Sequence, residues 1–493
     1  MSQIRFPHND FNSFEAPMRA EVDIRGLEVI QGRVPEHLDG GFYRQLGDKQ
    51  WPTYVENDIG IMNEDGMTSV FRFHKGRVDY RSRYVRTPRF IAEEKAGRAL
   101  FGAYRNPFDD DPSVRGTNRT LANVTTMAHG GRFMALKEDS RPLLLDPYTL
   151  ETYGEYDFDG ALRAMTCTAH AKVDPQTGEM VFYAYCAKGP ATKDIAYYET
   201  DARGKIIHET WFEAPYTCMV HDLMVTRNFV VIPFTPLRHE YEWLQRREPA
   251  FKWDASFPTC LAVLPRKGRA QQIRWFRAPA CFHGHVVGAW DDGRRIYADN
   301  TVGQRAFFPF FPNVDGSPFN PADAKPVVKR WIIDMGSSGD SYEEKPIFPY
   351  VGELPRIDTR FETTAYNYAA MALIDVPEHK RVGKPLMGFQ WIASFDVNGR
   401  REPQIYYAGD DCSISEPQFV PKHDTAPEGD GYLLAVVGRH REMRNDLLIL
   451  DARNLNAPPI ATVALPIRIR DTGHGCWFST RQLSGERNVA SDH

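Results

Sequence analysis

Short apolar runs separated by turn-forming residues limit what this chain can fold into. Runs such as EMVFYAYCA, NFVVIPF, QIYYAGD, GYLLAVVGR and DLLILDA are rich in β-branched and aromatic residues, and Gly, Asp, Asn and Pro lie between them. Their length and spacing are typical of antiparallel hairpins rather than of strand–helix–strand units. Four segments repeat a strand, an Asp-led turn and a second strand: LLLDPYTLETYGEYDF, AKVDPQTGEMVFYAY, YYETDARGKIIHETWF and LLILDARNLNAPPIATVALP. We interpret these as outer hairpins of propeller blades, within an all-β fold.

The organisation along the chain favours one large β domain. A length of 493 residues also allows two or three average domains, but no low-complexity linker divides the sequence. We therefore expect a single domain over residues 1–493. One compact helix is expected within RFIAEEKAGRALFGAY, residues 89–104, where alanines and a leucine recur at helical spacing.

Composition excludes several classes of function. The formal net charge of −5 and the lack of a basic run argue against a nucleic-acid partner. No apolar run approaches the roughly 18 residues that would predict a membrane span. Seven cysteines without a CxxC pair, and a polar beginning MSQIRFPHNDF, are typical of reduced thiols and of a cytoplasmic protein.

Four histidines in four different contexts are candidate metal ligands: His170 in TAHAKVDPQTGE, His221 in MVHDLMVT, His285 in FHGHVVGAW and His474 in TGHGCW. They are too far apart in sequence for a local metal finger, so they can meet only where distant strand ends converge. Four neutral imidazoles suit a borderline metal such as Fe(II) and leave its two charges uncancelled. His283 competes with His285, because residues two apart on a regular strand face the same side.

Three glutamates are candidates for the groups that hold these imidazoles. A histidine that binds a metal usually donates its second ring N–H to a carboxylate or carbonyl. The chain offers Glu138 in FMALKED, Glu353 in VGELPRID and Glu416 in SEPQFVPK. All three lie in apolar or proline-containing segments, where a carboxylate is unfavourable unless it is paired.

These contexts, together with GGFYRQ, HGGRFMALKE, GELPRIDTRF and HGCW, resemble the carotenoid cleavage oxygenase family over nearly the whole chain. The resemblance implies a seven-bladed β-propeller, capped by loops and short helices, over an axial iron held by four histidines and backed by three glutamates. The family's pattern after its third ligand matches VVGAWDDG and selects His285. The segments RTPRF, LFGAYRNPFDDDPSVRG, ALKED and WFRAPA are most similar to the branch that acts on phenolic alkenes, the lignostilbene dioxygenases and isoeugenol monooxygenases.

That branch implies an Fe(II) oxygenase with O2 as co-substrate, cleaving the C=C bond conjugated to a 4-hydroxyphenyl ring and releasing an aromatic aldehyde such as vanillin. Isoeugenol, 4-vinylguaiacol and lignostilbene are the substrate types. The matching tyrosine and lysine of the branch bind the substrate's 4-hydroxyl, which assigns Tyr104 and Lys137 as catalytic and substrate-binding residues. Carotenoid cleavers usually place an aromatic residue at the position of Lys137.

Three further residues match the wall of the substrate pocket. Phe282 and Phe308 correspond to lining aromatics, and Met62 stands where lignostilbene cleavers tend to have an aromatic residue. Val124 replaces the family's threonine near the iron. Neither departure changes the expected class of reaction, but both leave the choice between stilbenes and short alkenylphenols open.

Three alternatives stay open. The first is cleavage of a carotenoid or apocarotenoid on the same iron. The others are a non-catalytic propeller scaffold and a structural zinc site, although the latter normally includes cysteine. We expect a small phenolic alkene as the partner, with no nucleic acid and no membrane span, and a homodimer is allowed.

Overall fold

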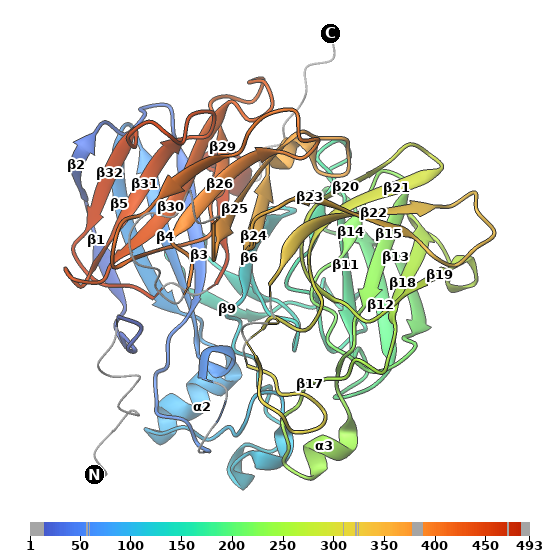
Figure 1. Cartoon of the computed structure of the whole chain (residues 1–493). Helices are drawn as coiled ribbons and strands as arrows, with labels where there is room; N and C mark the ends of the chain where they lie inside the picture. The colour runs from blue at the N-terminus through green and yellow to red at the C-terminus, as the bar shows by residue number, and fades with distance from the viewer. Residues whose placement is uncertain are drawn as a thin grey trace.

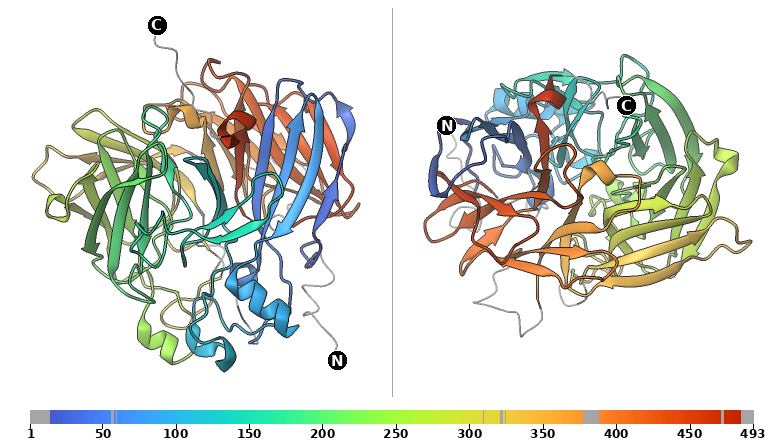
Figure 2. Two further views of the ribbon diagram at one scale, coloured as in Figure 1. Left: turned by 180° about the vertical axis from the view of Figure 1, so that it is seen from behind. Right: turned by 90° about the horizontal axis from the view of Figure 1, so that it is seen from above.

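The strands form a ring of sheets around a common centre. The computed structural model describes residues 14–55, 58, 60–308, 310–320, 323, 325–376, 388–470 and 473–484. Within these residues, seven sheets of four to six strands follow one another around the ring as the blades of a propeller, seen from the side in Figure 1 and from above in Figure 2, right. The predicted all-β, seven-bladed propeller is confirmed.

The first four blades follow the chain order, except that the first also holds the last strand. Blade 1 contains β1 (Val22–Ile24), β3 (Gly40–Gly47), β4 (Gly66–His74), β5 (Arg77–Tyr84) and β33 (Gly475–Ser479). Blade 2 contains β6 (Thr125–His129), β7 (Arg132–Leu136), β8 (Leu143–Leu145) and β9 (Thr152–Glu155). Blade 3 contains β10 (Lys172–Val173), β11 (Met180–Tyr185), β12 (Asp194–Thr200) and β13 (Ile206–Glu213). Blade 4 contains β14 (Met224–Val225), β15 (Phe229–Phe234), β18 (Thr259–Pro265) and β19 (Arg274–Ala278).

The other three blades complete the ring. Blade 5 contains β20 (Phe282–Asp291), β21 (Arg295–Gly303), β22 (Val327–Asp334) and β23 (Glu343–Phe348). Blade 6 contains β24 (Gly352–Ile357), β25 (Tyr368–Leu373), β26 (Trp391–Asp396) and β27 (Gln404–Tyr407). Blade 7 contains β2 (Glu28–Gly32), β28 (Cys412–Ile414), β29 (Gln418–Pro421), β30 (Gly431–Arg439), β31 (Arg444–Asp451) and β32 (Ala461–Leu465). A small separate sheet pairs β16 (Leu237–Arg238) with β17 (Lys252–Trp253).

Two exchanges of strands close the ring. The late strand β33 pairs antiparallel with the early strand β3, from Gly40 opposite Ser479 to Arg44 opposite Gly475. In the other direction, the early strand β2 pairs with β32 of blade 7. Blue and red strands therefore lie side by side in Figures 1 and 2. Because each of these two blades contains strands from both regions of the chain, the ring cannot open without breaking a sheet.

Short helices lie outside the ring. They are α2 (Pro88–Ala96), α3 (Tyr241–Gln245) and α4 (Thr480–Leu483), and α2 and α3 lie on the same side of the propeller in Figure 1 and in Figure 2, left. The expected helix over 89–104 is shorter than predicted. It ends at Ala96 because Gly97 adopts the left-handed conformation (φ 67°) and its N–H turns back to the last carbonyls. In the described part of the chain, no helix is both long and apolar enough to cross a membrane.

The repeated hairpins occupy two different places in the blades. LLLDPYTLETYGEYDF, YYETDARGKIIHETWF and LLILDARNLNAPPIATVALP form β8–β9, β12–β13 and β31–β32, in the outer parts of their blades as expected. AKVDPQTGEMVFYAY forms β10–β11, at the other edge of the sheet that ends in β13. For this segment the prediction of an outer hairpin is wrong.

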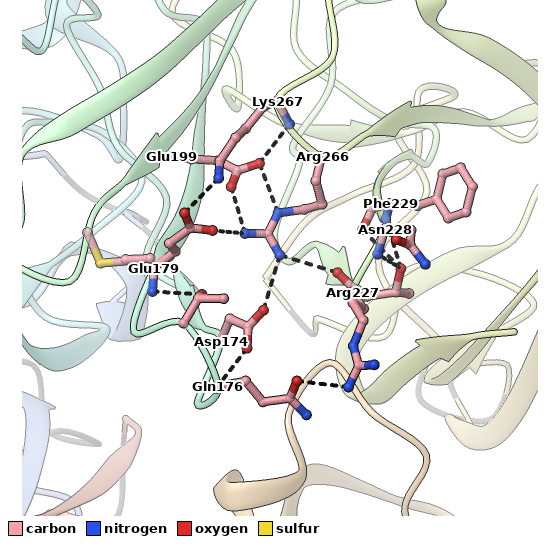
Figure 3. A network of polar contacts seen from close by, with 12 residues as sticks. Asp174, Gln176, Glu179, Glu199, Arg227, Asn228, Phe229, Arg266 and Lys267 are labelled. Atoms are coloured by element: carbon pink, nitrogen blue, oxygen red, sulfur yellow. Dashed lines mark hydrogen bonds and ion pairs between the residues drawn. The ribbon is translucent and has the colours of Figure 1, made fainter. Parts of the chain in front are cut away.

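A buried ionic network joins blade 3 to blade 4 (Figure 3). Arg266, directly after β18, has a side chain only 9% exposed and meets the fully buried Glu199 of β12. Its Nε donates to Glu199 Oε1 at 2.8 Å and its Nη2 to Oε2 at 2.6 Å. Glu179 also accepts from Nη2, at 3.1 Å. Burial alone would raise the pKa of Glu199, but the hydrogen bonds and charge of Arg266 outweigh it and hold that pKa below its usual value.

Replacing Arg266 with alanine is expected to lower the free energy of unfolding by about 3–5 kcal/mol, because Glu199 would stay buried without its guanidinium. Chemical denaturation measures this change. Arg227→Ala is the matched control, since Arg227 is exposed and its Nη2 donates to Gln176 Oε1. The control should stay within about 0.5 kcal/mol of the parent protein. Equal stability of the two variants would contradict the assigned role of the network.

Candidate metal centre

Four histidines from four blades meet at the centre of the propeller. His170 lies just before β10, His221 just before β14, His285 within β20 and His474 just before β33. One ring nitrogen from each lies within 4.8 Å of those of the other three. The structure thus brings together four side chains that are up to 304 residues apart in the chain, as their numbers show.

The choice between His283 and His285 is made by an irregular strand. Pairing of β20 with β21 shifts register between His283 and Val286, so the expectation that both histidines share a face is wrong here. His283 lies 3.2 Å from Asn300 Oδ1 through its Nε2 and packs against Trp331, while His285 joins the cluster.

Three buried glutamates bind the outer nitrogens of three of these rings. The pairs are His221 Nδ1 with Glu138 Oε1 at 2.7 Å, His285 Nδ1 with Glu353 Oε2 at 2.6 Å, and His474 Nδ1 with Glu416 Oε1 at 3.0 Å. Burial alone would raise the pKa of Glu138, but the hydrogen bond from His221 outweighs it and holds the pKa at about 2. Because an ionised carboxylate can only accept, each of these Nδ1 atoms carries the proton. In the neutral form of each ring, the Nε2 atom is then a lone-pair donor.

The inner nitrogens of the cluster fit a metal ion. His221 Nε2 and His285 Nε2 lie 3.0 Å apart, and both are lone-pair atoms in the tautomer that the glutamates select. His170 Nε2 is buried and has no hydrogen-bond partner among the described residues. Burial lowers the pKa of His170 well below its usual value, which favours the neutral ring. Inward-facing lone pairs of neutral imidazoles repel one another unless a cation lies among them.

Two local features support the glutamates, and sequence reasoning missed both. Arg356 Nη2 donates to Glu416 Oε2 and to the carbonyl of Gly475, each at 2.9 Å, which ties this carboxylate to the first residue of β33. A side chain at Gly284 would place its Cβ 2.2 Å from Glu353 Oε1, so glycine there allows this carboxylate to approach. Gly284 lies within the motif FHGHVVGAW and Arg356 within GELPRIDTRF. Their place in these motifs was the only indication of a role that the sequence offered.

A second polar group surrounds Lys137, the residue before Glu138. Its side chain is buried, and Nζ donates to Asn123 Oδ1 at 2.6 Å and to the carbonyl of Met62 at 3.3 Å. The same nitrogen lies 5.1 Å from the centre of the Tyr104 ring, and Tyr104 is also buried. Burial lowers the pKa of Lys137. Asn123 was not anticipated from the sequence, and Met62 takes part through its main chain.

The remaining expected pocket residues lie at different distances from the cluster. The Phe308 ring is 5.1 Å from the His221 ring, and Phe282 packs 5.1 Å behind it, almost fully buried. Val124 is half-buried, and its carbonyl accepts from the N–H of His474 at 3.2 Å. Phe308 thus touches the histidines directly, whereas Phe282 supports it.

Fold and site together define a β-propeller protein with a central four-histidine cluster that could hold a metal ion. The sequence profile of the family described as Retinal pigment epithelial membrane protein (RPE65) matches residues 15–479. The chain therefore belongs to the RPE65, or carotenoid oxygenase, family, as its motifs predicted.

Relatives within this family are similar over nearly the whole chain. Isoeugenol monooxygenase of Pseudomonas putida is 43% identical over 465 residues, which cover 94% of this chain and 96% of that protein. Lignostilbene-alpha,beta-dioxygenase isozyme III of Sphingomonas paucimobilis is 39% identical over 474 residues, covering 95% and 96%. The crystal structure of Pseudomonas brassicacearum lignostilbene dioxygenase superposes with a TM-score of 0.92 at 37% identity, covering 97% of this chain and 100% of that one. The expected similarity to the isoeugenol monooxygenase and lignostilbene dioxygenase branch is confirmed.

The metal content of a ligand variant tests the centre. His474→Ala should lose most of its bound metal, measured by elemental analysis after purification, because one of four inward-facing nitrogens is removed. His423→Ala is the control, since His423 is exposed and contacts Thr425. Full metal content in the His474 variant would contradict the assignment.

Neutralising one carboxylate tests the three histidine–glutamate pairs. Glu353→Gln keeps an oxygen acceptor for His285 but deletes the charge, so metal affinity should fall about ten- to a hundredfold. Competition with a chelator measures this affinity. Glu343→Gln serves as the comparison, because Glu343 is exposed and pairs only with Lys345 in the described structure. Equal affinities in both variants would show that Glu353 does not support the centre.

Proposed function

We propose that this protein is a non-haem Fe(II) oxygenase that uses O2 to cleave the C=C bond conjugated to a 4-hydroxyphenyl ring, as in isoeugenol, 4-vinylguaiacol or a lignostilbene. An aromatic aldehyde such as vanillin is the product. The single observation that carries the proposal is the buried ammonium of Lys137 beside Tyr104, one residue from the glutamate that holds His221. The isoeugenol monooxygenase and lignostilbene dioxygenase relatives support the same class of substrate.

The donor set is the reason for choosing iron. His170, His221, His285 and His474 would hold it, and four imidazoles without a thiolate suit a borderline divalent metal. None of the cysteines belongs to the cluster, whereas structural zinc sites normally use them. When bound, ferrous iron supplies the redox chemistry that O2 requires.

The residues around Lys137 would bind and orient the phenol. A phenol has an ordinary pKa of about 10, and a neighbouring ammonium favours its ionised form. A phenolate pushes electron density through the ring into a conjugated alkene, which makes that alkene easier to oxidise. Because Lys137 and Glu138 are consecutive, one strand end positions both the phenol anchor and a supporting group of the metal centre. The anchor therefore orients the ring as well as activating it.

Cleavage of a carotenoid or apocarotenoid on the same iron is the alternative. A hydrocarbon chain placed against Lys137 would leave the buried ammonium without a compensating charge, which is costly. Phe308 beside His221 offers an apolar surface that suits either substrate. A phenolic substrate is better supported than a carotenoid, because only a phenol can pair with the Lys137 ammonium.

We also propose that residues 1–493 act as a single domain in the cytoplasm. The pairing of β3 with β33 supports the single domain, because it joins early and late parts of the chain in one sheet. The seven cysteines, all free thiols, support a reducing compartment.

Lys137→Met tests the phenol anchor. Turnover of isoeugenol and of a 4-hydroxystilbene should fall about 10- to 100-fold, because a charge-assisted hydrogen bond to the substrate is lost, while the iron content stays unchanged. Product aldehyde is measured by chromatography. Lys188→Met is the control, since Lys188 is a surface residue paired with Asp194.

The unmutated enzyme provides the complementary measurement. The 4-O-methyl ether of the same substrate should be cleaved about 10- to 100-fold more slowly, since it cannot ionise. Rapid cleavage of the ether, or a fully active Lys137 variant that also cleaves an apocarotenal, would favour the alternative.

A further inference from the structure

Asn123 occupies a fixed place between the segment that carries Met62 and the strand end that carries Lys137. The residue is buried, at 8% exposure. Its Oδ1 accepts from Lys137 Nζ at 2.6 Å, and its Nδ2 donates to the carbonyl of Glu64 at 2.8 Å. An ammonium can only donate and a carbonyl can only accept, so the amide has a single orientation. Asn123 thus joins the segment that carries Met62 to the end of β7.

The hydrogen bonds of Lys137 leave one of its donors unused. An ammonium has three N–H groups, and two acceptors lie within reach, Asn123 Oδ1 and the Met62 carbonyl. The third N–H has no acceptor among the described residues, and the same nitrogen lies 5.1 Å from the centre of the Tyr104 ring. Because the Met62 contact uses a main-chain oxygen, the side chain at position 62 can vary without changing this anchor.

Both acceptors of Lys137 are uncharged, as is the Tyr185 hydroxyl that accepts from the buried Arg105, whereas three other guanidinium groups with little exposure meet carboxylates. Arg266 pairs with Glu199, Arg330 with Asp299, and Arg470 with Glu64. In the described part of the chain Lys137 forms no ion pair, and the neighbouring Glu138 carboxylate is bound to His221. The carboxylates of Asp139 and Glu138 favour the ammonium form without touching the nitrogen, so an anionic ligand atom at the third N–H would add a direct counter-charge.

We propose that Asn123 is a positioning residue for the substrate phenol. Its neutral amide fixes the orientation of the Lys137 side chain without neutralising the ammonium. The positive charge can then pair with the phenolate oxygen. An aspartate at this position would form an ion pair with Lys137 and cancel that charge, whereas an alanine would release the side chain. The inference rests on the proposed function, because it assumes that a phenol is the group that enters.

The ionisation of a bound coloured phenol distinguishes cancellation of the Lys137 charge from loss of the side chain's orientation. The probe is 4-nitrophenol, whose phenolate is distinguished from the phenol by visible absorption. In the parent protein the pH at which the bound probe ionises should fall by about one unit or more relative to the free probe. Asn123→Asp should abolish this fall. Asn123→Ala should keep it but weaken binding about tenfold or more, because the ammonium loses an acceptor that directs it.

Asn118→Asp is the matched control, since it introduces the same residue earlier in the same segment, where Asn118 contacts Glu155. It should bind and ionise the probe as the parent does. Metal content and melting temperature are measured for every variant, and kcat and KM for isoeugenol are determined separately. We expect KM to rise in Asn123→Ala and kcat to fall further in Asn123→Asp.

Several results would overturn the inference. One is an Asn123→Asp variant that ionises and binds the probe as the parent protein does. Another is an equal loss in both variants accompanied by lower melting temperature and metal content, since that would indicate a structural role alone. If Asn123→Asp does not fold, unchanged probe affinity in Asn123→Ala overturns it. If the parent itself does not shift the ionisation, the proposed phenol anchor fails along with the role of Asn123.

Discussion

Closure of the ring by the pairing of β33 with β3 is the constraint on which the metal centre depends. Residue 474 lies directly before β33, so the position of this strand sets the position of the fourth imidazole. Two main-chain hydrogen bonds reinforce it, from Gln45 N–H to the His474 carbonyl at 2.9 Å and from His474 N–H to the Val124 carbonyl at 3.2 Å. Every blade then contributes one side chain: blades 1, 3, 4 and 5 supply the histidines, and blades 2, 6 and 7 supply the glutamates. The centre is a property of the complete ring rather than of any one segment.

The charges at the centre are arranged in two separate groups. Three carboxylates and the guanidinium of Arg356 lie around the four imidazoles, and their formal charges sum to minus two, which would balance a divalent cation. Lys137 donates only to neutral acceptors, and in the proposed function its ammonium would pair directly with the substrate oxygen. In the proposed function, a metal ion and a phenolate would thus be held by different residues, although Lys137 and Glu138 are adjacent in the chain. This separation lets the binding of metal and the binding of phenol be tested independently.

The sequence was informative where a local pattern carries the signal. Short apolar runs predicted an all-β chain, and the contexts of His170, His221 and His474 marked them without any knowledge of contacts. The number of blades came from family resemblance, because the hairpins differ in length and two of them occupy different edges of one blade. The separation of His283 from His285 depends on a shift of register against β21, which no local pattern shows. Asn123 and Arg356 were missed because their roles arise from partners distant in the chain, such as Glu64 and Gly475.

Because the chain is synthesised from its N-terminus, the first blade can be completed only after its last strand, β33, has been made. Strand β3 ends at Gly47, while its partner β33 begins at Gly475, after all the other blades. Joining segments so far apart carries a large loop-closure entropy, and such non-local pairings form slowly. During translation the first three imidazoles are present while the fourth is still missing, so the emerging chain offers only an incomplete set of donors. A metal ion held by all four nitrogens could therefore bind only late, after the segment that carries His474 has left the ribosome and closed the ring.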